Sequence, residues 1–197
     1  MDAIHARGGS LRGPNLRRHQ QAFTLVELSV TVAGLGTVIA LSLPKLSATV
    51  SHNHMRSVRD EFTSAVGRMR TEAIHRNRCV SLCISSNAKT CNSGSSTNWS
   101  AGWLMYQNQS CGAAEGASIA PEDIIAASQS IPSHFDLQSN SAGSRSAFSA
   151  NARGVILVNA GTFTLRDTRQ PCQPSTTMTI SWQGRVRLDE IASTQCP

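Results

Sequence analysis

The chain has 197 residues and a formal net charge of +6, from 18 Lys and Arg against 12 Asp and Glu. This length allows one modest domain plus an appendage. Residues 1–22 hold four Arg and one Asp, so the remaining 14 basic and 11 acidic residues leave only +3, which excludes a generally polyanion-binding composition.

The first predicted element is a membrane span over residues 23–43, a run of apolar and small residues with one charge. As a helix rising about 1.5 Å per residue, this run would cross roughly 30 Å of hydrocarbon. Basic residues ahead of it predict a cytoplasmic N-terminus and an exported remainder: Arg7, Arg12, Arg17, Arg18 and His19.

The one charge in the span is Glu27, and a carboxylate in a bilayer is costly unless it is paired. One alternative is that Glu27 lies near the interface and reaches water. The string "A-FTLVEL", residues 22–28, resembles the processing site of type IV pilins and type II secretion pseudopilins. This resemblance implies that residues 1–22 are a leader, that a prepilin peptidase cuts between Ala22 and Phe23, and that the new Phe23 amine is methylated. The family usually has Gly where this chain has Ala22.

The same resemblance gives Glu27 a role in assembly as the fifth residue of the mature chain. Its carboxylate can meet the Phe23 amine of a neighbouring subunit, and a buried ion pair fixes register better than it adds stability. A secretory signal peptide is the competing interpretation, but it requires a shorter apolar core and an A-x-A-like site. The segment "LRRHQQA" resembles a complete short leader, so a later translation start is a second alternative.

An amphipathic helix is predicted over residues 51–75, after a kink or local unwinding at Pro44. Apolar residues recur every three or four positions on one stripe, which predicts packing against a sheet: Met55, Val58, Phe62, Val66, Met69 and Ala73. We therefore divide the rod into a transmembrane and assembly segment (23–46) and an amphipathic half (47–78).

Residues 79–197 are expected to form an antiparallel β-sheet domain, because short β-like runs alternate there with Gly, Ser, Asn and Pro. The predicted strands are 79–85, 102–107, 134–139, 146–150, 154–159, 162–167, 177–182 and 185–190. The string "VNAGTF" predicts a hairpin with Gly161 at its turn. The expected fold class is α+β and pilin-like, a long N-terminal helix packed on this sheet domain.

The strings "FSANARGVILVNAGTFTLRD" and "TMTISWQGRVRL" resemble the C-terminal half of the GspH/FimT group of minor pilins and pseudopilins. The resemblance implies a single-pass inner-membrane protein with a periplasmic C-terminal domain, which then enters a pilus or pseudopilus. It also implies three partners: other pilins or pseudopilins, the prepilin peptidase and the inner-membrane assembly machinery.

The string "QGRVRL" places Arg185 and Arg187 two residues apart, so on a strand both point to one face, about 6.6 Å apart. Val186 and Leu188 would then face the core. Gly184 would leave the approach to Arg185 open and permit a turn. Two guanidiniums on one ridge can bind neighbouring phosphates.

In the FimT branch, this G-R-x-R motif is associated with DNA binding during natural transformation, which implies DNA contacts by Gly184, Arg185 and Arg187. The alternative is two solvated arginines that balance Asp189 and Glu190. Four further arginines would extend the patch if they lie nearby: Arg145, Arg153, Arg166 and Arg169. The three tryptophans could stack on bases, but core packing is the expected role of Trp99, Trp103 and Trp182.

Six cysteines follow the span, and an even number in an exported domain predicts disulfides with 15 possible pairings. Cys172 paired with Cys196 would pin the C-terminus, and Cys83 paired with Cys91 would close a seven-residue loop. Cys79 and Cys111 would then form the third pair. A different pairing or free thiols stay open.

No pattern in the chain predicts an enzyme, a cofactor or a metal site. His52 and His54 do not face each other on a helix, and Cys79 and Cys83 lack zinc-ribbon spacing. The predicted function is a minor type IV pilin of the FimT kind that primes assembly and binds extracellular DNA for natural transformation. The alternative is a GspH-like minor pseudopilin of a type II secretion system, and assembly as the whole function is a third interpretation.

Overall fold

The computed structural model describes residues 24–92, 96–112, 118–140, 146–158 and 161–192, with the side chains of 41–48 and 158 not described. The chain divides into two compact units, residues 1–45 and 46–197. Ala22, Phe23 and Cys196 therefore lie outside the described residues.

One helix, α1 (Leu25–Arg76), contributes to both units. It begins after Thr24, whose hydroxyl oxygen accepts a hydrogen bond from the N–H of Glu27 at 3.2 Å, as an N-cap residue does. The backbone is helical through Pro44, so the local unwinding that we predict there is wrong, although the boundary between the units lies one residue later, after Lys45.

The first half of α1 exposes its apolar side chains all around the helix. Those more than half exposed are Leu25, Val26, Leu28, Val30, Val32, Leu35, Val38 and Ile39. Among the described residues, no helix combines the length and the apolar character that crossing a membrane requires. The span over residues 23–43 thus stays a prediction.

The second half of α1 buries the predicted apolar stripe, from Met55 to Ala73. Phe62 is central to this contact: its ring centroid lies 5.4 Å from that of Trp103 and 4.9 Å from that of Phe163. The helix ends where Asn77 adopts a positive φ of 50° and the N–H of Arg78 donates to the carbonyl of Ala73 at 3.2 Å. The predicted packing stripe is confirmed.

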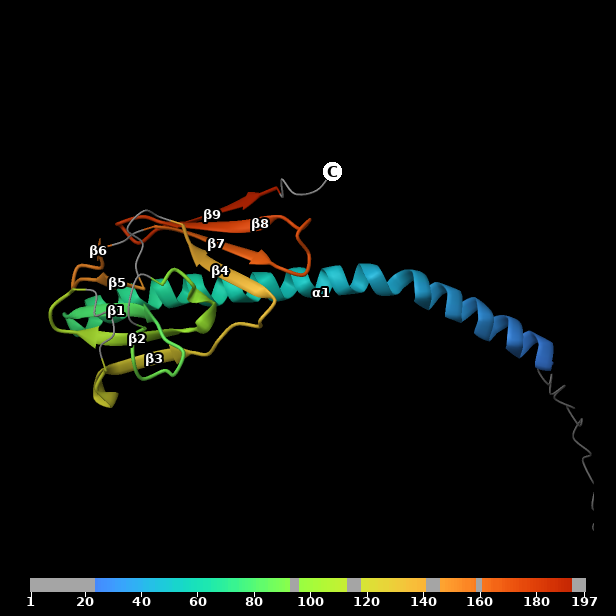
Figure 1. Ribbon diagram of the computed structural model, residues 1–197, viewed down its shortest axis with the longest axis horizontal. Helices are drawn as coiled ribbons and strands as arrows, with labels where there is room; N and C mark the ends of the chain where they lie inside the picture. Colours follow the sequence, from blue (N-terminus) through green and yellow to red (C-terminus); the bar gives the residue numbers. More distant parts are fainter. Residues whose placement is uncertain (1–23, 93–95, 113–117, 141–145, 159–160, 193–197) are drawn as a thin grey trace, which may run out of the picture. The chain divides into compact units, whose positions relative to one another are not determined.

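Two antiparallel sheets pack on this half of the helix (Figure 1). The five-stranded sheet has the order β3-β2-β1-β5-β6 and the four-stranded sheet the order β4-β7-β8-β9. Their bounds are β1 (Cys79–Ile84), β2 (Trp103–Asn108), β3 (Ile124–Ser128), β4 (Phe135–Ser139), β5 (Ala147–Ala150), β6 (Ile156–Val158), β7 (Thr162–Asp167), β8 (Ser175–Ile180) and β9 (Val186–Ile191), with short 3₁₀ helices η1 (Trp99–Ala101) and η2 (Pro121–Asp123). The α+β fold with a helix packed on antiparallel sheets is confirmed.

Two features of the sheets differ from the prediction. β3 is an additional strand that the sequence pattern does not predict. The "VNAGTF" hairpin is wrong, because β6 pairs with β5 in one sheet while β7 lies between β4 and β8 in the other. The strands on either side of Gly161 therefore lie in different sheets.

Disulfides fasten loops to β1. Cys79 is bonded to Cys111 and Cys83 to Cys91, which coincide with two of the pairs considered from the sequence. Cys172 is also disulfide-bonded, and the partner considered for it, Cys196, is not among the described residues.

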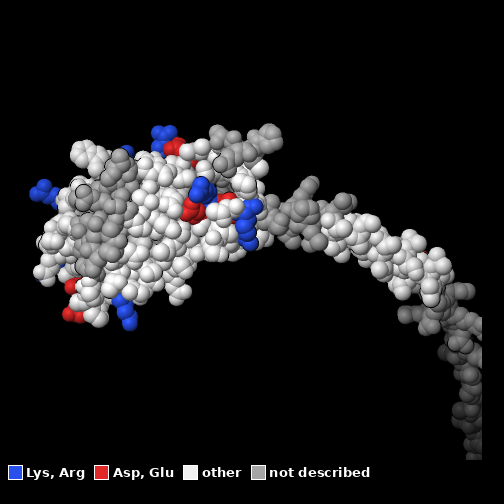
Figure 2. Space-filling model, in the orientation of Figure 1, with Lys and Arg blue, Asp and Glu red and all other residues white. Residues whose placement is uncertain are grey.

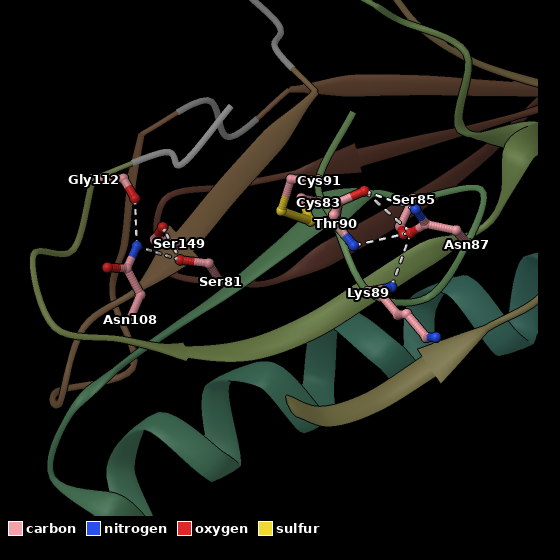
Figure 3. Close-up of a disulfide and its surroundings, with 10 residues drawn as sticks. All are labelled: Ser81, Cys83, Ser85, Asn87, Lys89, Thr90, Cys91, Asn108, Gly112 and Ser149. Atoms are coloured by element: carbon pink, nitrogen blue, oxygen red, sulfur yellow. Dashed lines mark hydrogen bonds between the residues drawn. A yellow bond between two sulfur atoms is a disulfide. The ribbon is translucent and has the colours of Figure 1, made fainter. Parts of the chain in front are cut away.

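The loop closed by Cys83–Cys91 is ordered by one side chain (Figure 3). The side-chain oxygen of Asn87 accepts hydrogen bonds from the backbone N–H groups of Lys89 and Thr90, both at 2.9 Å. The same close-up shows a second polar group, in which Asn108 donates to the Ser81 hydroxyl at 2.9 Å and Ser81 lies 2.6 Å from Ser149. These bonds link β1, β2 and β5 on the sheet face that carries both disulfides.

Candidate functional site

The candidate site is built on the turn that joins β8 to β9. The N–H of Gly184 donates to the carbonyl of Ser181 at 2.7 Å, and Gly184 has a φ of +71°. The backbone N–H of Arg185 donates to the Ser181 hydroxyl at 3.1 Å. The turn conformation expected at Gly184 is therefore present, and it presents residues 182–185 at the end of the four-stranded sheet.

Arg185 and Arg187 are in different electrostatic surroundings. Arg187 lies on β9, the outermost strand, and its Nε is 3.0 Å from Asp189 Oδ2. Arg185 precedes β9 and is exposed, and among the described residues no carboxylate pairs with its guanidinium. Arg187 matches the ion-paired alternative considered from the sequence, whereas Arg185 is open to an anionic ligand.

The expected burial of the alternate residues on β9 is half right. Val186 packs against the core, but Leu188 is 45% exposed, so its predicted core position is wrong. The physical reason is that β9 is an edge strand with no neighbour on its outer side.

Gly184 does not leave an open approach, which corrects a second expectation. A Cβ atom built on Gly184 would lie 2.1 Å from Cδ of Arg70, which comes from α1. Glycine is required here because it accepts the positive φ and because the Arg70 side chain occupies the adjacent space.

Arg70 also reaches the turn between β5 and β6, residues 151–154. Its Nε donates to the carbonyl of Gly154 at 2.8 Å, and its Nη1 lies 3.4 Å from the carbonyl of Gly184. The two turns are joined further by the N–H of Ile156, which donates to the carbonyl of Trp182 at 2.8 Å. Two turns from different sheets thus lie side by side, and Arg153 is exposed on the first of them.

The other predicted basic residues do not all extend this site. Arg166 forms an ion pair of 2.7 Å with Asp136 on β4, towards the end of the four-stranded sheet opposite to the β8–β9 turn. Arg169 lies beyond the same end of β7, and Arg145 lies outside the described residues. On the face shown in Figure 2, basic side chains are scattered and several lie beside acidic ones. Of the three that the structure describes, only Arg153 lies on a turn next to that of Arg185.

The core position that we expect for Trp182 is wrong. Trp99 and Trp103 are buried, as expected, but Trp182 is 69% exposed. It lies in the turn, just beyond the end of β8. Its flanking residues in "SWQG" are the only sequence signal for this position, because polar residues and Gly on both sides indicate a turn rather than a core strand.

Comparison with known sequences assigns the chain to a family. The family described as type II transport protein GspH matches residues 59–184, which is more than half of the chain. The chain belongs to the GspH family. No curated protein matches the sequence. The GspH match ends at Gly184, directly before Arg185 and β9.

Comparison with solved structures gives the same fold. The chain is similar to two crystal forms of the type IV minor pilin FimU from Pseudomonas aeruginosa, both at 18% identity. They cover 75% and 72% of this chain and 95% and 96% of FimU, with TM-scores of 0.52 and 0.50. The minor pseudopilin EpsH from the type 2 secretion system of Vibrio cholerae matches at 12% identity over 70% of this chain and 97% of EpsH, with a TM-score of 0.46. The fold and the GspH match together identify a GspH/FimT-like pilin, that is, a minor pilin or pseudopilin.

A second candidate site of this GspH-family chain is the first half of α1. Glu27 is exposed there, in the first turn of the helix, among the exposed apolar side chains described above. At this position the backbone N–H groups of the first turn are partly unpaired, so a carboxylate is favoured.

Metal ligation has no support in the described part of the chain. There, no three His, Cys, Asp or Glu side chains are grouped closely enough to hold an ion.

Proposed function

We propose that the chain is a minor type IV pilin that is built into a pilus through the first half of α1. The observation that carries this proposal is the helix surface over residues 25–39, where large apolar side chains are exposed on all sides of the helix. A helix of this kind is stable only when lipid or other protein covers it. Neighbouring pilins in a filament would cover it, and the bilayer would do so before assembly.

The maturation steps form part of the same proposal. The prepilin peptidase would cut between Ala22 and Phe23, and the methylated amine of Phe23 would meet Glu27 of an adjacent subunit in the filament. Before assembly, the protein would be a single-pass protein of the inner membrane with its sheet domain in the periplasm. The assembly machinery of that membrane would then transfer it into the pilus.

Glu27→Gln tests the ion-pair role without changing the size of the side chain. The variant should be cut between Ala22 and Phe23 like the wild type, since the cleavage site is intact, but much less of it should reach the sheared filament fraction. Val30→Ala, three residues away on the same exposed helix surface, is the matched control. Normal incorporation of Glu27→Gln would contradict the role of this carboxylate.

DNA binding at the β8–β9 turn is the second part of the proposal. Arg185 and Arg187 would contact phosphates of extracellular DNA, with Gly184 shaping the turn that carries them. The supporting observation is the exposed Arg185 guanidinium without an acidic partner among the described residues. Arg187 would contribute less, because Asp189 neutralises part of its charge.

The test is DNA affinity of the full-length protein in detergent micelles over a range of salt concentrations. Arg185→Ala should weaken binding to all sequences and lower the slope of log K against log salt by about 1 for each lost phosphate contact. Arg187→Ala should have a smaller effect, and Asp189→Asn should strengthen binding. Arg166→Ala is the control, because that exposed arginine is paired with Asp136 near the other end of the sheet. If Arg185→Ala binds as the wild type does, the DNA proposal is wrong.

A pseudopilin of a type II secretion system is the alternative function, favoured by the description of the matched family as a transport protein. A deletion strain separates the two. Loss of pili or of DNA uptake with normal secretion supports the pilin, whereas retention of secreted proteins in the periplasm supports the pseudopilin.

A further inference from the structure

Among the described residues, Trp182 has the most exposed aromatic side chain. The backbone that carries it is nevertheless held by hydrogen bonds. Its carbonyl is held by the N–H of Ile156 at 2.8 Å, and the turn that carries it is closed by the bond from Gly184 to Ser181. An anchored backbone with an exposed indole is unusual, because burial of a Trp side chain is strongly favourable. The position therefore indicates a binding role for the ring.

The charges around Trp182 indicate the chemistry of the ligand. Neither of the two adjoining turns, residues 151–155 and 181–185, contains an Asp or Glu. Arg153 and Arg185 are both exposed on them, while Arg70 uses its guanidinium to hold the two turns together. An exposed π surface on one of two adjoining turns that carry exposed arginines and no acidic residue suits a ligand that combines aromatic faces with negative charge.

Nucleotides have this combination, and the faces of their bases are free only where the strand is unpaired. Aromatic side chains beside basic residues bind single strands by stacking on successive bases, with little sequence preference. In a duplex the same faces are covered by neighbouring base pairs. We propose that Trp182 stacks on unpaired bases of DNA, with Arg153 and Arg185 contacting the flanking phosphates. This inference rests on the proposed DNA binding and names the form of DNA that the site prefers.

The experiment compares two fluorescently labelled probes of equal length and charge, about 12 nucleotides each. One is oligo-dT and the other an abasic oligonucleotide with the same number of phosphates. The full-length wild type in detergent micelles should bind oligo-dT about tenfold more tightly than the abasic strand. Trp182→Ala should remove this difference and leave the affinity for the abasic strand unchanged. Trp182→Phe, which keeps an aromatic face, should retain most of it.

Arg185→Ala separates this inference from the proposed function. It should weaken the binding of both probes, because it removes a phosphate contact that both share. If both probes bind and depend on Arg185, but Trp182→Ala has no effect on the affinity for oligo-dT, the stacking inference is wrong while DNA binding stands. If the wild type binds neither probe at low salt, both are wrong.

A protein partner is the other class of ligand that an exposed Trp fits. If Trp182→Ala leaves the affinity for oligo-dT unchanged but reduces incorporation into filaments, the ring is a contact between subunits, and the stacking inference is overturned. An equal unfolding temperature of Trp182→Ala and the wild type, expected for an exposed side chain, ensures that the binding data report on the ring.

Discussion

Cδ of Arg70 fills the space where a side chain at Gly184 would begin: a Cβ atom there would lie only 2.1 Å away. The same arginine donates a hydrogen bond to Gly154 in the neighbouring turn. One helical side chain thus sets the spacing between two turns of different sheets. The exposed residues of the candidate site, Arg153, Trp182 and Arg185, are placed by this contact.

Gly184→Ala should destabilise the protein by more than about 1–2 kcal/mol, since the positive φ alone has that cost for a residue with a Cβ and the contact with Arg70 adds to it. The measurement is denaturant unfolding followed by circular dichroism. Gly67→Ala on the exposed face of α1 is the control and should be neutral or stabilising by up to about 1 kcal/mol, because nothing lies within 4 Å of the added Cβ. Equal stability of Gly184→Ala and the wild type would show that the turn is not packed as described.

Arg70→Met keeps most of the aliphatic stem but removes the guanidinium. It should cost about 1.5–3 kcal/mol, because it removes charge-assisted hydrogen bonds to the carbonyls of Gly154 and Gly184. It should also weaken oligonucleotide binding although Arg70 is not proposed to touch DNA. Arg68→Met, two residues earlier and mostly exposed, should cost less than about 1 kcal/mol, since it removes one surface ion pair. Identical unfolding curves for the two variants would refute the clamping role of Arg70.

Replacing Cys83 and Cys91 together by Ala should lower the free energy of unfolding by about 2–3 kcal/mol, from loss of a short closed loop. Replacing Cys79 and Cys111 should cost about 1 kcal/mol more, because that bond joins residues 32 positions apart in the sequence rather than 8. Peptide mapping under non-reducing conditions checks the pairs directly. Recovery of a peptide that joins Cys79 to Cys83 would contradict them.

Acidification should weaken the end of α1 through Glu72. The hydrogen bond from Arg76 holds the pKa of Glu72 below its usual value of 4.5, with a weaker contribution from Arg68. A carboxyl group whose pKa is lowered by folding stabilises the native state above its usual pKa, and this stability is lost as the pH falls through the lowered value. Glu72→Gln should therefore be less stable than the wild type at pH 7 by under about 1 kcal/mol, and the difference should shrink as the pH falls below 4.5 and disappear once the pH is below the lowered pKa of Glu72. A difference that persists at low pH would contradict the ion-pair explanation.

Much of the fold is predictable because burial follows local periodicity. Apolar residues spaced by three and four placed the stripe around Phe62 correctly, and alternating residues placed β1 and β7 within a residue of their observed bounds. The sequence does not predict β3, because "IIAAS" has no alternation and its side chains are only partly buried. The hairpin at Gly161 was mispredicted because a turn signal is local, whereas the partner of each strand is decided by packing across the whole domain.

The turn at the candidate site is predictable from the sequence, but the residues that pack around this turn are not. The sequence "GRVR" indicated a glycine turn followed by a basic strand, and Gly184 has the expected positive φ. Arg70 could not be anticipated, since 114 residues separate it from Gly184. Trp182 was assigned to the core because most tryptophans are largely buried, and only its polar neighbours indicated otherwise.

Incorporation into a filament is the central claim, and the N-terminus of the native protein tests it most directly. Mass spectrometry of the protein in sheared filaments should find a chain that begins with methylated Phe23 and retains the apolar helix that follows. A protein that keeps residues 1–22, or one that is found free in the periplasm after loss of the apolar helix, would contradict the claim.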